Sequence, residues 1–247
     1  HTFALGVRWL LSVWENFHAR QVYRADAWGI MRTGARWLSA LMLINRANPV
    51  SLLDNSPLRE LLARTMDFPR IQENIDTGSL YAVSITASGY TSGQSVSFYQ
   101  GGPEALEWER MQRVGAATPI DVDILMASSA LPFIFPAVKV HREYFGDGSM
   151  RQIAPISPAL HLGADRVMII GTGRQNADSR VRSSLYPSLA QIAGHALNSI
   201  FLDSLNVDIE RLQRINRTVS LIPPDRLREA GLPLRPVEVL VISPSQP

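Results

Sequence analysis

The hydrophobic positions of this chain follow a helical period in some stretches and a strand period in others. Residues 3–14 are apolar on nearly every side of a helix, which predicts a helix to about His18 that requires burial on all its faces. Ser79 to Ser88 is rich in β-branched and aromatic residues, and Ser95 to Tyr99 alternates with period two. These two stretches predict a β-hairpin whose turn lies at Gly89 to Gly93.

Prolines, glycines and capping residues predict where the other elements begin and end. Ser56 is expected to cap a helix that has Pro57 in its first turn, and Thr118 to cap one that runs to about Ser129. The remaining predictions are helices at Trp37–Ile44, from Pro69 to Gly78, at Ser157–Leu162, from Leu185 to about Arg217 and at Pro224–Ala230, and strands at Val138–Val140, Glu143–Phe145, Arg166–Ile170 and Val237–Ile242.

Strands that alternate with helices predict an α/β layered fold. Residues 1–247 are expected to form one domain, with a helical lead-in (1–50), a core (51–175) and C-terminal helices with a strand (176–247). The first helix starts without a cap and the last strand ends close to the C-terminus. We therefore expect the chain to be a piece of a longer domain, truncated at both ends.

Composition and charge exclude several classes of protein. Hydrophobic residues make up 46% and charged residues 19%, which suits a folded core, and the net charge of +2 is too small to predict nucleic-acid binding. The absence of Cys excludes thiolate chemistry. No apolar run reaches about 18 residues, so no membrane span is expected. The expected location is the cytoplasm, with peripheral membrane contact as an option.

Tryptophans lie among arginines in the N-terminal region, and two interpretations of this stay open. Such a mixture is typical of a membrane-interface surface, but the tryptophans are equally compatible with a core position behind a solvated arginine face. The residues concerned are Trp9, Trp14, Trp28 and Trp37, with Arg8, Arg24, Arg32 and Arg36.

The candidate chemistry is carried by one carboxylate. Asp147 stands between Gly146 and Gly148, after two short strands. Flanking glycines leave a carboxylate sterically open and permit positive φ angles where a tight turn needs them. An Asp-Gly pair is also a strong signal for a type I′ hairpin turn, which is the alternative interpretation.

A longer pattern around this carboxylate resembles a known family. The segment Ala127-Ser128-Ser129-Ala130-Leu131-Pro132-Phe133-Ile134-Phe135-Pro136, followed by Phe145-Gly146-Asp147-Gly148, is similar to the patatin-like phospholipases. The resemblance implies a three-layer α/β/α fold with a mostly parallel central sheet, and a lipid acyl hydrolase with Asp147 as the base of a Ser-Asp dyad. Ser149 stands where that family usually has Gly or Ala.

Two other motifs of the family are absent from the chain. We find neither a glycine-rich oxyanion loop nor a G-x-S-x-G nucleophile elbow, and Gly89 to Gly93 places its serine one position too late. The nucleophile and the N-terminal strands are therefore expected outside these residues. Gly171-Thr172-Gly173 is only a weak dinucleotide signal. No cofactor and no metal is expected.

A free Asp, with a pKa of about 3.9, is a poor base, so the site must desolvate or orient it. Phe133, Phe135 and Phe145 are candidates for an apolar wall, with Phe133 and Phe135 as substrate-binding residues; the alternative is that all are core aromatics. His141 could complete a Ser-His-Asp triad, although an exposed hairpin turn at His141 fits its context better.

The substrate class implied by the resemblance is a phospholipid or another acyl ester. A transacylase would use the same acyl-enzyme, because water and another alcohol compete for it. A catalytically silent lipid-binding or scaffold domain is the alternative of a different class. The chain alone, with only the Asp half of the dyad, is expected to be inactive.

Overall fold

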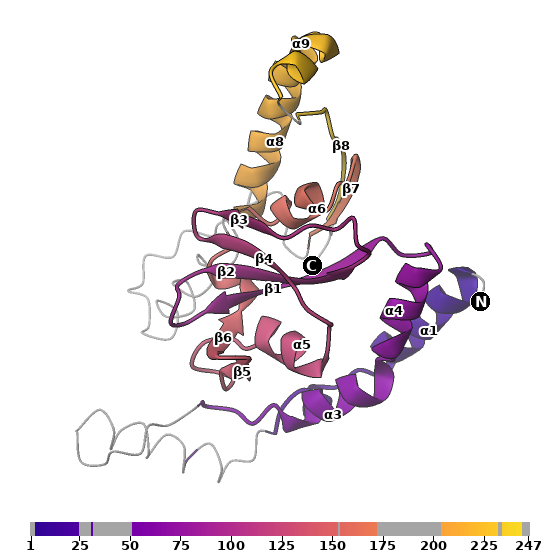
Figure 1. Cartoon of the computed structure of the whole chain (residues 1–247). Coiled ribbons are helices and arrows are strands. Elements are labelled where there is room, and N and C mark those ends of the chain that lie inside the picture. The colour runs from indigo at the N-terminus through magenta and orange to yellow at the C-terminus, as the bar shows by residue number, and fades with distance from the viewer. Residues whose placement is uncertain are drawn as a thin grey trace, which may run out of the picture.

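The computed structural model of the chain has a mixed α/β architecture, with two sheets and flanking helices (Figure 1). It describes residues 3–24, 31, 51–152, 154–171, 204–231 and 234–243. The strands are β1 (Ala82–Gly89), β2 (Ser95–Gly101), β3 (Trp108–Arg110), β4 (Arg113–Ala117), β5 (Val138–Val140), β6 (Glu143–Asp147), β7 (Arg166–Ile170) and β8 (Glu238–Ile242). The helices are α1 (Phe3–Glu15), η1 (Ala19–Gln21), α3 (Ser56–Thr65), α4 (Pro69–Asp76), α5 (Val122–Ser128), η2 (Gly148–Met150), α6 (Ser157–His161), α8 (Ser204–Ser220) and α9 (Pro224–Glu229).

The larger sheet has the strand order β3-β4-β2-β1-β6-β5 and is mixed. Only β2 and β4 pair in parallel within it, whereas β7 and β8 form a separate parallel pair. The prediction of a mostly parallel sheet is therefore corrected to a mixed one in the described residues. The physical reason is chain connection: β1–β2, β3–β4 and β5–β6 are joined by short turns, and a short turn can only join antiparallel strands.

One face of the larger sheet carries the main core. Alternate residues of β1 and β2, including Ala87 and Phe98, point to this face and pack with Ile124 of α5 and Phe145 of β6. Phe98 and Phe145 meet edge to face, with ring centroids 5.2 Å apart. The hairpin pattern in the sequence is thus confirmed, and its apolar positions pack with α5.

The opposite face of the sheet is polar near its centre and aromatic near β3. Thr86 and Ser97 lie side by side there, with their hydroxyl oxygens 3.1 Å apart. Trp108 of β3 stacks between Tyr99 and His161, at centroid distances of 5.3 and 5.0 Å. His161 ends α6, so this aromatic stack joins α6 to the sheet.

A second core forms around the parallel β7–β8 pair. Ile169, Leu212 of α8 and Val237 pack together with Ile156, which precedes α6. In Figure 1 these C-terminal elements and α5 lie on opposite sides of the larger sheet. The other face of β7–β8 is open in the described residues: Met168, Ile170, Leu240 and Ile242 are exposed.

Most predicted elements are confirmed, and two helix starts need correction. Asn55, not Ser56, is the N-cap of α3, and the Ser56 amide instead donates to Asp54 Oδ1 at 2.9 Å. Likewise α5 starts after Asp121, whose carboxylate accepts the Ile124 amide at 2.9 Å, and not after Thr118. At α5, Asp121 makes the N-cap hydrogen bond that the pattern assigned to the Thr118 hydroxyl, whereas at α3 no side chain caps the helix.

Gly78 and Gly163 follow α4 and α6, as predicted, and both have positive φ. Some predictions concern residues outside the described ranges. These are the helix Trp37–Ile44, the tryptophans Trp28 and Trp37, Thr172-Gly173 of the weak dinucleotide signal, and the first part of the helix from Leu185.

Helix α1 exposes its apolar side chains instead of burying them. Trp9 and Trp14 are 52% and 63% exposed, and Leu10 and Leu11 are open as well. The expectation that this helix is buried all round is not met within the described residues, and the core interpretation does not hold for these two tryptophans. Among the described helices, none has both the length and the hydrophobicity that crossing a membrane requires.

Candidate active site

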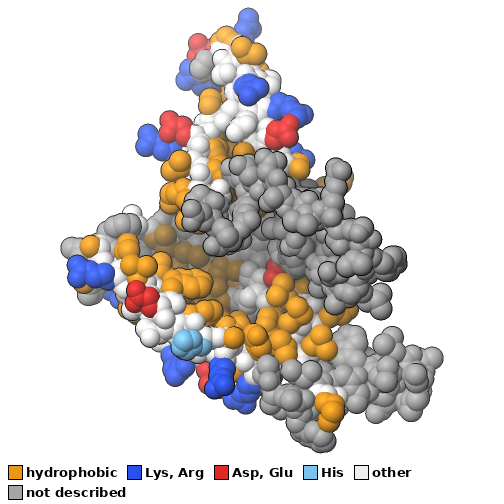
Figure 2. Space-filling model, turned by 180° about the vertical axis from the view of Figure 1, so that it is seen from behind, with side chains coloured by type: hydrophobic (Ala, Val, Ile, Leu, Met, Phe, Trp, Pro, Cys, Tyr) orange, Lys and Arg blue, Asp and Glu red, His pale blue; other side chains and the backbone are white. Residues whose placement is uncertain are grey.

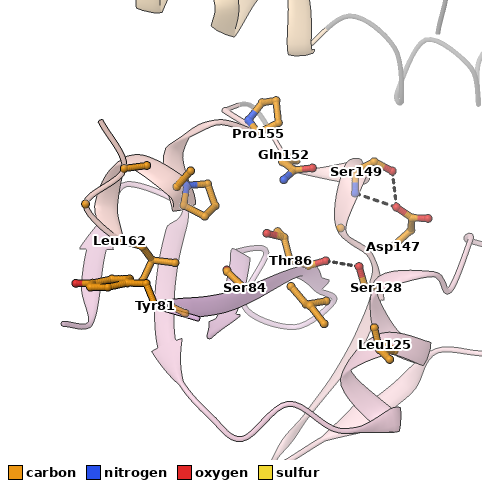
Figure 3. Close-up of a pocket in the computed structure, with 17 residues that line it drawn as sticks. Tyr81, Ser84, Thr86, Leu125, Ser128, Asp147, Ser149, Gln152, Pro155 and Leu162 are labelled. Atoms are coloured by element: carbon orange, nitrogen blue, oxygen red, sulfur yellow. Dashed lines mark hydrogen bonds between the residues drawn. The ribbon is translucent and has the colours of Figure 1, made fainter. Parts of the chain in front are cut away.

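A cavity of about 980 Å³ lies beside β1 and contains Asp147 (Figure 3). Its floor includes Ser84, Ile85 and Thr86 of β1, and α5 contributes Leu125 and Ser128. Asp147 and Ser149 stand at one end, whereas Tyr81 and Leu162 stand at the other. On the face shown in Figure 2, the molecule is hollowed between its C-terminal protrusion and the remainder of the chain, and hydrophobic side chains line the hollow.

Asp147 is the last residue of β6 and the N-cap of η2. One carboxylate oxygen, Oδ1, accepts the amide of Ser149 at 2.9 Å and also the Ser149 hydroxyl. The other oxygen, Oδ2, has no hydrogen bond with the described residues. The side chain is partly buried. One oxygen is thus fixed by the chain, and the other is available to accept a proton.

The two glycines around Asp147 serve close packing. Neither has a positive φ. A Cβ on Gly148 would lie 2.1 Å from the carbonyl oxygen of Thr86, and one on Gly146 would lie 2.4 Å from the Tyr90 hydroxyl. The expectation that they permit a positive φ is therefore wrong, and so is the type I′ turn, because Asp147 leads into a 3₁₀ turn. Glycine is needed at position 148 because the β1 backbone lies against it, and at position 146 because the Tyr90 ring does; neither leaves room for a Cβ.

The segment from Ala127 to Ala130 holds Asp147 against β1. The Ser128 hydroxyl donates to the Thr86 carbonyl at 2.8 Å and so ties the end of α5 to β1. The Asp147 amide donates to the Ala130 carbonyl at 2.9 Å. Ala127 and Ala130 are buried, which brings the end of α5 close to β6. The sequence pattern around residues 127–147 thus corresponds to one packed unit.

Tyr90 is a neighbour of Asp147 that the sequence pattern did not reveal. Its amide donates to the Tyr144 carbonyl at 3.0 Å, and its ring covers Gly146. Burial, and to a smaller extent the negative charge of Asp147, raise the pKa of Tyr90 above its ordinary value. The sequence feature that could have indicated a neighbour here is Gly146, since a glycine often marks the close approach of another group.

Phe133 and Phe135 lie away from the cavity. Phe133 is 63% exposed with a φ of 66°, and its carbonyl accepts the Leu52 amide at 2.9 Å. Phe135 packs on Tyr23, with ring centroids 6.4 Å apart. The loop turns outward because it pairs with residues 52–53. Phe145 is a core aromatic. The cavity's apolar lining comes instead from Ile85, Leu125, Leu162 and two prolines, Pro155 and Pro158.

His141 lies in the exposed turn between β5 and β6, at φ 54°. Asp147 is at the other end of β6, so the two residues are roughly 13 Å or more apart along the strand. This arrangement argues against a Ser-His-Asp triad that includes His141. No cluster of metal-ligating side chains occurs among the described residues.

Comparisons with known proteins do not identify the chain. No protein-family model and no curated protein sequence matches it. The resemblance to patatin-like phospholipases therefore stays a prediction from the sequence motif at residues 127–148.

Proposed function

We propose that this chain is the aspartate-bearing part of a lipid acyl hydrolase of the patatin-like type, with the nucleophilic serine on polypeptide outside these 247 residues. The observation that carries the proposal is the position of Asp147 at one end of a cavity of about 980 Å³, with Oδ1 held by Ser149 and Oδ2 open. In this proposal the mixed α/β structure is part of a three-layer α/β/α domain.

The proposed chemistry needs one carboxylate and one hydroxyl. The serine hydroxyl attacks the ester carbonyl and passes its proton to Asp147, which gives that proton to the leaving oxygen as the tetrahedral intermediate collapses and the alcohol departs. Water then attacks the acyl-enzyme and gives a proton to the same carboxylate, which returns it to the serine oxygen as the fatty acid is released. An alcohol in place of water would give transacylation. The hydrogen bonds from Ser149 support this role, because they fix the orientation of the base.

Serines within the described cavity do not fit the part of the nucleophile. Ser149 bonds to Asp147 two residues away, which is a local turn contact, and Ser128 is engaged with the Thr86 carbonyl. Ser84, the third described serine of the cavity, lies within strand β1. None of the three stands at a strand-to-helix elbow with backbone donors for an oxyanion. This observation favours the second candidate, a silent lipid-binding or scaffold domain, if no serine reaches the cavity from elsewhere.

Peripheral membrane contact is part of the proposal. The exposed side chains of Trp9 and Trp14 lie on one short helix with Leu10 and Leu11, and tryptophan is well suited to the lipid interface. A lipid hydrolase must reach substrate that is held in a membrane, and such a helix would give it contact with the surface.

The coding sequence immediately upstream of His1 tests the proposal at once. A G-x-G-x-x-G segment followed by G-x-S-x-G supports the enzyme, whereas a start codon immediately before the His1 codon supports the silent domain. The protein of the whole reading frame should then hydrolyse a fluorogenic phospholipid, and a fluorophosphonate probe should label its serine. The 247-residue chain alone should stay at the background rate. Full activity of the chain alone would overturn the assignment of the serine to another segment.

A further inference from the structure

A second, much smaller cavity lies on the polar face of the larger sheet, and residues 152–158 cover it. It measures about 10 Å³, which is room for roughly one water-sized particle. Its floor is formed by Thr86 of β1 and by Ser95 and Ser97 of β2, and Arg113 of β4 stands at its side. Polar side chains of the sheet therefore make up most of its lining.

Strand pairing brings these four side chains to one point of the sheet. Ser97 is the register partner of Thr86 in β1, and Ser95 is the register partner of Arg113 in β4. Paired residues of neighbouring strands point to the same face, and so do residues two positions apart in one strand. The three hydroxyls and the guanidinium therefore project from the same face of the sheet.

The hydroxyls of this floor have more hydrogens to donate than acceptors to take them. Ser95 is only 4% exposed, and its hydroxyl makes no hydrogen bond with the described residues. The hydroxyl oxygens of Thr86 and Ser97 are 3.1 Å apart, so one hydroxyl donates to the other and one hydrogen is left over. A buried donor without an acceptor destabilises the folded chain, so an acceptor is expected at this point.

Arg113 adds a positive charge to these donors. Its side chain is partly buried, and its guanidinium has neither a carboxylate partner nor a hydrogen bond within the described residues. Among the described residues that line the cavity there is no Asp or Glu. Burial, followed by the charges of Arg110 and Arg113, lowers the pKa of His161 below its ordinary value, so positive charge is concentrated where α6 covers the sheet. A guanidinium does not lose its proton, and a partly buried charge needs a counter-ion.

From this cavity we infer a binding site for one chloride-sized anion, held by the Arg113 guanidinium and by the hydroxyls of Ser95 and the Thr86–Ser97 pair. A monatomic anion accepts hydrogen bonds from every direction, neutralises the guanidinium and is only slightly larger than a water molecule. Phosphate and sulfate are several times too large for the cavity. Water could accept the hydrogen bonds, but it would leave the charge of Arg113 without a counter-ion.

The bound ion would join the sheet to the segment that follows Asp147. Thr86 and Gln152 line both this cavity and the larger one (Figure 3), and Ser157 of α6 closes the smaller cavity from the other side. Chloride should therefore stabilise the packing of residues 152–158 on β1 and β2. The inference does not rest on the proposed function, because its readout is the stability of the folded chain and not ester hydrolysis.

Thermal unfolding of the 247-residue chain at constant ionic strength tests the inference. Sodium chloride is raised from about 2 to about 200 mM, and sodium gluconate, whose anion is too large for the cavity, keeps charge screening constant. The midpoint should rise by about 3–7 °C for a dissociation constant on the order of 10 mM, because the ion binds only the folded chain. Sodium bromide should act in the same way as sodium chloride.

Two substitutions assign the effect to this cavity. Arg113→Gln removes the charge and should abolish the rise, whereas Arg142→Gln, at an exposed arginine in the β5–β6 turn, is the matched control and should keep it. Ser95→Ala removes the hydroxyl that has no partner. It should be no less stable than wild type at low chloride, and it should gain less than wild type when chloride is added.

The width of the chlorine NMR line detects the bound ion directly. Wild type should broaden the line, bromide should reverse the broadening, and Arg113→Gln should lose it. A midpoint that does not respond to chloride, or that responds equally in Arg113→Gln, would overturn the inference, because the cavity would then hold water only. An Arg113-dependent rise with sulfate would also contradict it, since the site would then take a larger anion. If Arg113→Gln does not fold, Ser95→Ala and the bromide competition still decide.

Discussion

The orientation of Asp147 depends on neighbours within two residues of it in the chain. Ser149 holds Oδ1 through its amide at 2.9 Å and through its hydroxyl. Gly148 lets the chain pass against the Thr86 carbonyl of β1. The Ser149 hydroxyl is thus a second contact to Asp147, in addition to the Ser149 amide.

Gly148→Ala should lower the free energy of unfolding by about 1–3 kcal/mol, because the new methyl would overlap backbone atoms that have little room to move. Urea unfolding followed by circular dichroism measures the change. Gly6→Ala is the matched control: nothing lies within 4 Å of a Cβ there, and alanine is better than glycine within a helix by about 1 kcal/mol. An unchanged urea midpoint for Gly148→Ala would show that β6 is not packed against β1 as described.

Sequence reasoning singled out Asp147, which lines the cavity, but misjudged the positions of Phe133 and Phe135. Asp147 could be found because its neighbours in the chain determine its setting. The directions of Phe133 and Phe135 depend on a pairing with residues 52–53, some eighty positions earlier, which no local pattern carries. Tyr90 was missed for the same reason, since the hairpin turn brings it to Gly146 from another part of the chain.

At the scale of elements, local pattern predicted strands better than helix starts. The alternation in Ser95–Tyr99 and the apolar run Arg166–Ile170 correspond to β2 and β7. Helix starts were shifted because Asp121, and not Thr118, caps α5, and because both the amide and the hydroxyl of Ser56 donate to Asp54. Apolar content does not tell whether two strands pair in parallel or antiparallel, because the direction depends on which strands become neighbours in the sheet.

The stack of His161 on Trp108 should make stability depend on pH. Burial, followed by the positive charges of Arg110 and Arg113, lowers the pKa of His161 below its ordinary value of 6.5. The unfolded chain therefore takes up a proton before the folded chain does as pH falls. The stability that neutral His161 contributes to the folded chain is fully present above pH 6.5. It is lost as the pH falls from 6.5 through the lower pKa of His161 in the folded chain.

His161→Phe keeps an aromatic ring on Trp108 but removes the titration. Urea unfolding at a series of pH values from 7.5 down to 4.5 should show a smaller loss of stability for His161→Phe than for wild type. Identical pH dependence of the two chains would mean that His161 does not titrate differently in the folded state.

The exposed face of α1 should bind lipid surfaces if the membrane proposal is correct. Trp9→Glu together with Trp14→Glu should reduce sedimentation with anionic phospholipid vesicles severalfold, because two interfacial anchors become charged. Met111→Glu, in the exposed β3–β4 turn, is the matched control and should leave sedimentation unchanged. No binding of the wild-type chain to such vesicles would rule out the membrane-facing role of this helix.

At the scale of the whole molecule, the cavity lies where two separately packed parts meet. The larger sheet and α5 supply Asp147 and the β1 residues that line the cavity, while α6, which packs with the β7–β8 core, supplies the opposite wall. In the proposed function, Asp147 is the base and the cavity holds the substrate. What the proposed reaction still needs is a hydroxyl nucleophile next to Oδ2.

The rate of ester hydrolysis by Asp147→Asn in the protein of the whole reading frame tests the central claim most directly. An amide cannot accept the serine proton, so the rate should fall by about 10²–10⁴-fold while circular dichroism stays unchanged. Asp67→Asn, an exposed carboxylate between α3 and α4, should keep the wild-type rate. Wild-type hydrolysis by Asp147→Asn would contradict the account, because the base would then have to be another residue.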